Sequence, residues 1–133
     1  ISLASYLPKA EVYVVTTPQP AAQTVAQRAA TMANKVRLTV KGVIENMAWF
    51  TGDDGKRYDL FGSGGGQELA DKLGVPLIGQ LPLLPALRDG GDTGRPITVT
   101  DPDGEAGQAF ARIADWVEAN GPTRRYNREL KIV

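Results

Sequence analysis

The hydrophobic pattern of the chain repeats a simple plan of an apolar run, a turn and a helical stretch. The first apolar run is Val12–Val15, which is continuous and largely β-branched, as in a strand buried on both faces. A polar, proline-containing turn follows, and Pro20 suits a first helical turn because it lacks the N–H that would be unpaired there. The next helix is predicted to bury one face, formed by Val25, Ala29, Met32, Ala33 and Val36.

A second unit begins with the apolar run Gly42–Ile44. A long loop follows, and the turn signal Asp53–Gly55 lies within it. A short helix is then predicted around Leu69–Leu73, because its apolar residues recur at helical spacing. Gly74 is placed to end this helix in the left-handed conformation.

A third unit begins with Leu77–Gly79 and continues into a long loop, Leu83–Thr100, that is rich in glycine and proline. Asp101 and Pro102 are predicted to be the N-cap and first turn of the last helix. Gly121 and the proline after it should end that helix. Its apolar face is predicted to contain Phe110, Ile113, Ala114 and Val117.

Strands that alternate with helices predict the α/β class, with a parallel sheet and crossover helices on its faces. Three strands, with a short helix near Ser2–Leu7, would form only a thin core. We therefore expect residues 1–133 to be the C-terminal part of a single domain whose other strands lie upstream. Residues 121–133 are expected to form a tail.

The charge balance argues against nucleic acid as a partner. The chain has 15 basic and 15 acidic residues and no histidine, so it lacks the basic surplus that neutralises phosphates. Arginines and a lysine gather only in the last residues, where a solvated tail is the favoured interpretation. No apolar run reaches the roughly 20 residues of a membrane helix, and no signal peptide is visible, so we expect a cytoplasmic protein.

The chain contains no cysteine. Disulfides, thiolate nucleophiles and cysteine-ligated metals are therefore excluded within it. Since histidine, the commonest general base at neutral pH, is also absent, we expect this segment alone to be catalytically inactive.

A ligand is expected at the C-terminal ends of the strands, because open parallel sheets bind ligands there. Asn46 follows the second strand, and its amide both donates and accepts hydrogen bonds, a pattern that can pair with the edge of adenine. Pro82 and Leu83 follow the third strand and offer apolar walls for a purine face. Asn46 has an equally favoured alternative role as a turn residue that bonds its own backbone.

The glycine run Gly62–Gly66 does not match a phosphate loop, since G-x-x-x-x-G-K-[ST] is absent. It also does not follow a strand directly, as a dinucleotide fingerprint would. Its simplest interpretation is a flexible entry to a helix that packs close to its neighbours. The polar loop Arg88–Pro96 is interpreted as a solvated connection.

Four strings in order then indicate a family: residues 16–19, 42–47, 61–66 and 87–92. They closely resemble the Mrp/ApbC iron–sulfur cluster carriers, within the MinD/ParA class of P-loop ATPases. The resemblance extends from Ile1 to about Ala119. It implies a MinD-like P-loop NTPase domain of which this chain is the C-terminal portion, with the phosphate-binding half absent.

The resemblance also implies function. It predicts a homodimer that binds ATP with Mg²⁺, hydrolyses ATP and carries iron–sulfur clusters to client proteins. By the same resemblance Asn46 reads adenine, and Pro82 and Leu83 lie beside the base. The phosphate-binding lysine and the magnesium-binding residue would come from upstream.

One feature departs from that family. Cluster-carrying members usually have a Cys-x-x-Cys pair in the interval that here reads Ala48–Leu60, which contains no cysteine. Asp53 and Asp54 are hard oxygen donors and poor substitutes for thiolates. We therefore expect this chain to supply no cluster ligand.

Two alternatives stay open at this point: a ParA/MinD-like partitioning or scaffold module, and a dinucleotide-binding domain. The upstream sequence distinguishes them. A glycine-rich string ending in Gly-Lys-Ser/Thr identifies an ATPase, and a glycine fingerprint followed by an acidic residue identifies a dinucleotide site.

Overall fold

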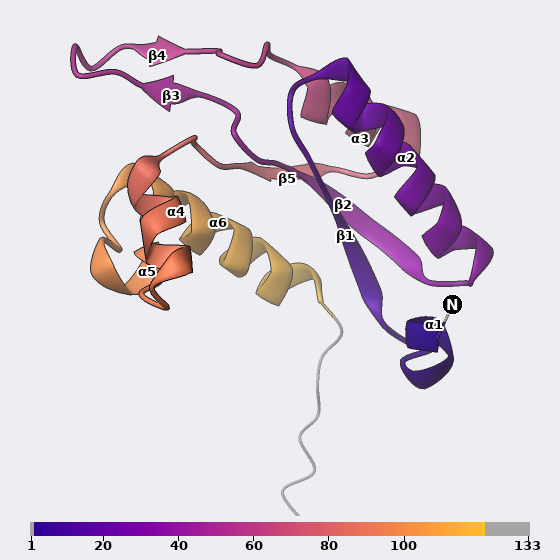
Figure 1. Cartoon of the computed structure of the whole chain (residues 1–133). Coiled ribbons are helices and arrows are strands. Elements are labelled where there is room, and N and C mark those ends of the chain that lie inside the picture. Colours follow the sequence, from indigo (N-terminus) through magenta and orange to yellow (C-terminus); the bar gives the residue numbers. More distant parts are fainter. Residues whose placement is uncertain (1, 122–133) are drawn as a thin grey trace, which may run out of the picture.

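The computed structural model describes residues 2–121, which fold around a parallel sheet of three strands in the order β1-β2-β5 (Figure 1). These strands are β1 (Glu11–Thr16), β2 (Thr39–Glu45) and β5 (Leu77–Gln80). They correspond to the three apolar runs, so the predicted parallel α/β fold is confirmed.

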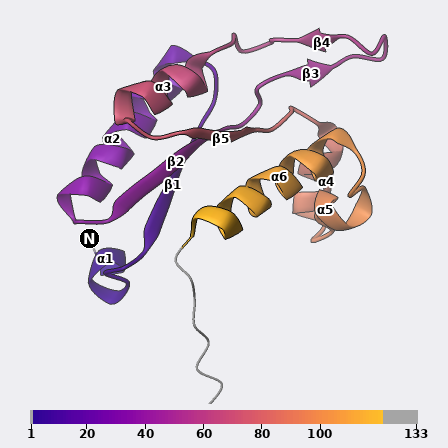
Figure 2. The same cartoon turned by 180° about the vertical axis from the view of Figure 1, so that it is seen from behind.

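Helices connect the strands and cover both faces of the sheet (Figures 1 and 2). Helix α2 links β1 to β2, and α3 lies between β2 and β5 along the chain. Helix α6 follows the last strand and packs against β5 on the other face. The helices are α1 (Ser2–Tyr6), α2 (Pro20–Lys35), α3 (Gly65–Leu73), α4 (Pro85–Asp92), α5 (Ile97–Thr100) and α6 (Glu105–Asn120).

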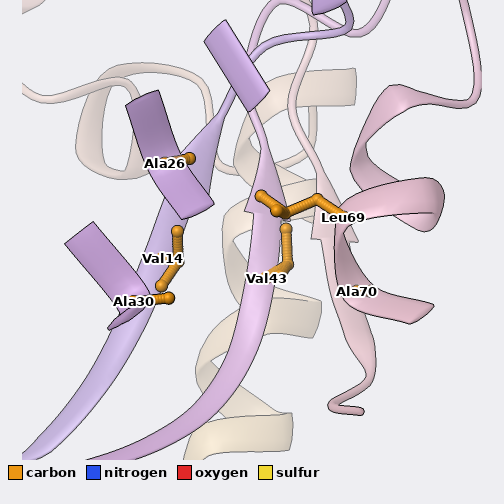
Figure 3. Close-up of a cluster of buried hydrophobic side chains, with 6 residues drawn as sticks. All are labelled: Val14, Ala26, Ala30, Val43, Leu69 and Ala70. Carbon is orange, nitrogen blue, oxygen red and sulfur yellow. The ribbon is translucent and has the colours of Figure 1, made fainter. Parts of the chain in front are cut away.

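Alternation along β2 divides the core into two clusters. Val43 is fully buried against α2 and α3, whereas its neighbour Ile44 packs into the cluster beneath α6. Successive strand residues point to opposite faces, which explains this division. Figure 3 shows the first cluster, which consists of Val14, Ala26, Ala30, Val43, Leu69 and Ala70.

The predicted buried face of α2 is largely wrong. Val25 and Met32 are 66% and 50% exposed, and Ala29 is also exposed. The helix instead buries the adjacent face, where alanine side chains allow it to lie close to β1 and β2. That buried face consists of Gln23, Ala26, Ala30 and Ala33.

The loop predicted after β2 contains a short antiparallel hairpin of β3 (Phe50–Thr51) and β4 (Arg57–Tyr58). Strands of two residues are too short to show an alternating pattern, so the sequence indicated only their turn. That turn is present, with Gly55 at a φ of 74°.

The loop predicted over Leu83–Thr100 is also more ordered than expected, because it contains α4 and α5. Pro85 occupies the first turn of α4, where a missing N–H does no harm. The chain then doubles back, and the Arg95 N–H donates to the Gly90 carbonyl oxygen at 2.8 Å. The glycine content of this segment therefore predicted a loop, whereas the chain forms a short helix followed by a tight turn.

The start of α6 is the last correction, because Asp101 and Pro102 precede the helix and Gly104 is its N-cap. The two residues cross over the first turn of α6 at Gly107. A Cβ there would lie 2.4 Å from the Asp101 carbonyl oxygen and 2.5 Å from that of Pro102. Helix α6 buries Ile113 as predicted but leaves Ala114 exposed.

Two further expectations concern the C-terminal tail and the absence of a membrane-spanning helix. Apart from its first residue, the predicted tail 121–133, with its basic residues, lies outside the described residues. Within residues 2–121, no helix is long and apolar enough to cross a membrane.

The crossing at Gly107 gives a stability prediction. Gly107→Ala should lower the free energy of unfolding by about 1–3 kcal/mol, because the new methyl group meets rigid backbone. Gly91→Ala in α4 is the matched control, since a Cβ at Gly91 meets no atom within 4 Å. It should raise the free energy of unfolding by roughly 0.5–1 kcal/mol through better helix propensity. Urea unfolding followed by circular dichroism measures both, and equal effects would contradict the packing.

Candidate functional site

The structure brings the predicted site residues to one edge of the sheet, where β2 and β5 end. Beyond the strands, backbone hydrogen bonds continue to pair the two segments that carry Asn46 and Leu83. Leu81 N–H donates to Glu45 O at 2.8 Å, Ala48 N–H to Leu81 O at 2.9 Å, and Leu83 N–H to Trp49 O at 2.7 Å. Asn46 and Leu83 therefore lie on neighbouring, fixed stretches of backbone.

Asn46 occupies a tight turn at the end of β2. Its backbone N–H donates to Thr16 O at 2.7 Å, and its side-chain Oδ1 accepts the Met47 N–H at 2.9 Å. Met47 has a φ of 54°, a conformation that non-glycine residues rarely adopt. The turn role of Asn46 is thus present. Among the described residues its Nδ2 donates no hydrogen bond, and Oδ1 keeps a second lone pair.

Pro82 and Leu83 differ in exposure. The ring of Pro82 is fully buried, below 2% exposed, whereas Leu83 is half-buried. Leu83 therefore presents apolar surface at this edge, whereas Pro82 is buried and restricts the backbone path.

An open groove of about 500 Å³ lies beside β1, and Asn46 is one of the residues that line it. Residues 12–17 of β1 and its following turn form one wall, and apolar residues of α2 form the other. The lining includes Asn46 but neither Pro82 nor Leu83. β1 is an edge strand of the sheet, and Val15 on it is 57% exposed. The α2 residues that line the groove are Ala22, Val25, Ala26 and Ala29.

A buried carboxylate lies next to Asn46, and sequence reasoning gave it no role. Glu45 is 1% exposed, and its Oε1 accepts the Gly66 N–H at 2.7 Å. Its Oε2 accepts a hydrogen bond from Gln80 Nε2 at 2.5 Å. One signal in the sequence could have indicated this role. Glu45 is an acidic residue that directly follows the apolar residues Val43 and Ile44, at a position where another apolar residue is usual.

The glycine run packs tightly against this edge. A Cβ on Gly66 would lie 2.7 Å from the Glu45 Cβ, and one on Gly65 would lie 1.9 Å from Gln23 Nε2. Gln23 is itself fixed by donating to the Pro18 carbonyl oxygen at 3.1 Å. The predicted close-packing role is therefore confirmed. Because Glu45 already occupies the N-terminus of α3, this run is not a phosphate loop.

The hairpin is fastened to α6 through Glu105. Trp49 Nε1 and Thr51 Oγ1 both donate to Glu105 Oε2, at 3.1 and 3.0 Å. The Arg57 guanidinium carbon lies 4.2 Å from the centroid of the Trp49 ring. A cation over an indole face adds attraction, so these contacts hold the interval 48–60 as a defined element.

A helix-covered parallel sheet, with a hydrogen-bonding amide and an apolar side chain at its C-terminal edge, has the architecture of nucleotide-binding α/β domains. The family model described as ParA, NUBPL iron-transfer P-loop NTPase, matches residues 1–118. The chain belongs to this family of P-loop NTPases.

The curated relatives carry a more specific description. The iron–sulfur cluster carrier protein of Mycobacterium leprae is 47% identical over 125 residues, covering 90% of this chain and 33% of the relative. The protein of the same description from Synechocystis sp. is 40% identical over 119 residues, covering 88% of this chain and 34% of the relative. The chain therefore spans about a third of the curated relatives it matches.

Solved structures agree on the fold. The cell division ATPase MinD of Pyrococcus furiosus superposes with a TM-score of 0.66 at 24% identity, covering 82% of this chain and 42% of that chain. This likeness shows the fold alone. A nucleotide-binding protein in complex with ADP from Archaeoglobus fulgidus superposes with a TM-score of 0.59 at 34% identity, covering 75% of this chain and 40% of that chain. The MinD-like P-loop NTPase fold is thus confirmed, and the dinucleotide-binding alternative finds no support.

The hairpin contains no cysteine thiolate. The sequence has no cysteine, and within residues 2–121 no group of three or more acidic, histidine or cysteine residues is placed to hold a metal. Asp54 is instead engaged locally, because its Oδ2 accepts the Tyr58 hydroxyl at 2.6 Å and its Oδ1 accepts the Lys56 N–H at 3.0 Å.

These hydrogen bonds shift two ionisations in opposite directions. The Tyr58 hydroxyl, followed by the Lys56 N–H, lowers the pKa of Asp54. The Asp54 carboxylate in turn raises the pKa of Tyr58. The pair therefore stabilises the fold between the ordinary pKa values of the two groups. That contribution is lost as pH falls through the lowered pKa of Asp54, or rises through the raised pKa of Tyr58.

Tyr58→Phe should raise the pKa of Asp54 towards its ordinary value, because the largest cause of the shift is removed. Carboxyl-detected NMR titration measures this directly. Tyr6→Phe is the matched control, since Tyr6 is 83% exposed and far from Asp54 in the sequence. An Asp54 pKa that is unchanged in Tyr58→Phe would show that the hydrogen bond does not form in solution.

Proposed function

We propose that this chain is the base-binding part of an ATPase domain in an iron–sulfur cluster carrier of the Mrp/ApbC type. One observation carries the proposal: in this chain of a P-loop NTPase family, the candidate base-reading residue Asn46 lies at the C-terminal edge of the sheet. Parallel sheets bind their ligands at that edge. ATP binding and hydrolysis are properties of the whole protein, to which this chain contributes one side of the site.

Asn46 reads the adenine in this proposal. Its unused Nδ2 donates to a ring nitrogen, and the second lone pair of Oδ1 accepts from the exocyclic amino group. The bond from Met47 N–H to Oδ1 orients the amide, so the turn role and the reading role support each other. Leu83 contacts the face of the base, and the buried Pro82 fixes the backbone that carries Leu83.

The phosphate-binding part lies upstream of this chain in the proposal. The sequence has no G-x-x-x-x-G-K-[ST] string, so the lysine and the magnesium ligand must come from another segment. The open groove beside β1 supports this arrangement. An additional strand pairing with the free edge of β1 would cover the groove and the exposed apolar face of α2.

The cluster role also rests on the whole protein. Since this chain supplies no thiolate, ligands for a carried cluster would have to come from outside residues 1–133. We place the protein in the cytoplasm as an ATP-dependent homodimer that acts on iron–sulfur client proteins.

Base preference tests the role of Asn46 in the full-length gene product. Asn46→Asp keeps an oxygen for the Met47 N–H, but it replaces a donor with an acceptor. A carboxylate pairs with the donors of guanine and repels the ring nitrogens of adenine, so preference should move from ATP towards GTP. Asn46→Ala should weaken ATP binding by about 1–3 kcal/mol, on the order of tenfold to hundredfold.

Isothermal titration with ATP, GTP and inorganic tripolyphosphate measures these changes. Tripolyphosphate is the control ligand, because it lacks the base, and its affinity should stay unchanged in both variants. A residue that only forms the turn predicts a different result: lower thermal stability in Asn46→Ala, little change in Asn46→Asp, and one ATP-to-GTP ratio throughout. That result would refute the adenine role.

The groove gives a second test in the same full-length protein. Val25→Glu should lower the free energy of unfolding by at least about 2 kcal/mol, because it would bury a charge under the upstream segment. Val99→Glu is the matched control. Val25 and Val99 are 66% and 74% exposed in this chain, but only Val25 lines the groove. Val99→Glu should stay within about 0.5 kcal/mol of wild type. Equal effects in urea unfolding would show that nothing covers the groove.

A further inference from the structure

We propose that Glu45 is a positioning residue for the base site: its buried carboxylate fixes the segment that carries Asn46 relative to the segment that carries Leu83. The inference rests on the proposed function for the identity of the ligand. The structural part of the inference does not depend on the ligand. It says only that the Glu45 side chain fixes the ends of β2 and β5 relative to each other.

Glu45 joins three elements at one point. It is the last residue of β2, it accepts the Gly66 N–H at 2.7 Å near the start of α3, and it accepts from Gln80 Nε2 at 2.5 Å at the end of β5. It is 1% exposed. Among the described residues no ion pair includes it, so the two donors and the N-terminal dipole of α3 stabilise its charge.

Glu45 is linked to both segments of the proposed site. Asn46 is the next residue along the chain, and Gln80 precedes the buried Pro82 by two positions. A backbone hydrogen bond joins the same two segments, because Leu81 N–H donates to Glu45 O at 2.8 Å. A shift of the Glu45 side chain therefore moves the ends of β2 and β5 relative to each other.

The surroundings of the carboxylate leave it little freedom. A Cβ on Gly66 would lie 2.7 Å from the Glu45 Cβ and 3.0 Å from its Cδ, so α3 packs directly on this side chain. Because it is enclosed, Glu45 cannot contact a nucleotide itself. Its action on binding must pass through Asn46 and Leu83.

The hydrogen-bond pattern around Glu45 can be tested by exchanging the residues at positions 45 and 80. Glu45 faces two donors, Gly66 N–H and Gln80 Nε2, and a carboxylate accepts from both. Gln80→Glu places a second carboxylate there, so two acceptors face each other. Glu45→Gln alone keeps a complementary pattern, because the Gln80 amide can turn over and accept from the new amide through its Oε1. Adding Glu45→Gln to Gln80→Glu restores a complementary pattern, because the carboxylate at position 80 accepts from the new amide at position 45.

The experiment compares wild type, Glu45→Gln, Gln80→Glu and the double variant in the full-length gene product, well below their melting temperatures. Gln80→Glu, which opposes two carboxylates, should reduce the ATP-to-GTP affinity ratio about tenfold and leave tripolyphosphate binding unchanged. Glu45→Gln alone should keep the ratio within about threefold of wild type. The double variant should recover the ratio to within about threefold of wild type.

Hydrogen–deuterium exchange supplies a readout that does not depend on nucleotide. Gln80→Glu should speed exchange in residues 46–48 and 81–83 and leave the hairpin residues 50–58 unchanged, and the double variant should reverse this. If wild type does not bind ATP, the proposed function fails and the exchange pattern alone decides the inference. An unchanged or uniformly faster pattern, or an ATP-to-GTP ratio that is lost but not recovered by the exchange of residues, would overturn the role of Glu45.

Discussion

The buried carboxylate of Glu45 is the interaction on which the C-terminal edge of this sheet depends. A charge that is 1% exposed needs hydrogen-bond donors around it, and here a helix N-terminus and a glutamine amide supply them. Each donor comes from a different element, so satisfying one charge fixes α3 and β5 against the end of β2. The turn at Asn46 and the path to Leu83 follow from that arrangement.

Small residues make this close approach possible. Gly65 and Gly66 admit α3 to within contact of Gln23 and Glu45, and Ala26 and Ala30 bring α2 down onto β1. Gly79 lets Ile113 of α6 approach the opposite face, where a Cβ would lie 2.3 Å from the Ile113 Cγ1. The sheet is therefore held by tightly packed backbones more than by large side chains.

The two edges of the site differ in how complete they are within this chain. The side formed by β2, β5 and α6 is closed by backbone hydrogen bonds and by the hairpin contacts of Trp49 and Glu105. The β1 side is open, with an apolar groove and an edge strand. This asymmetry fits a domain whose base side is supplied here and whose phosphate side is supplied by another segment, in line with the proposed role.

The sequence by itself determined the three strands, the parallel α/β class, the end of α3 at Gly74 and the position of Asn46 at a strand end, because these depend on local pattern and chain order. Tertiary structure decided which face of α2 is buried, because the helix lies so close to the sheet that the small Ala26 is buried there and the larger Val25 is exposed. It also decided that Pro82 is buried whereas Leu83 is half-buried. The role of Glu45 depends on donors 21 and 35 residues away, which no local pattern can bring together.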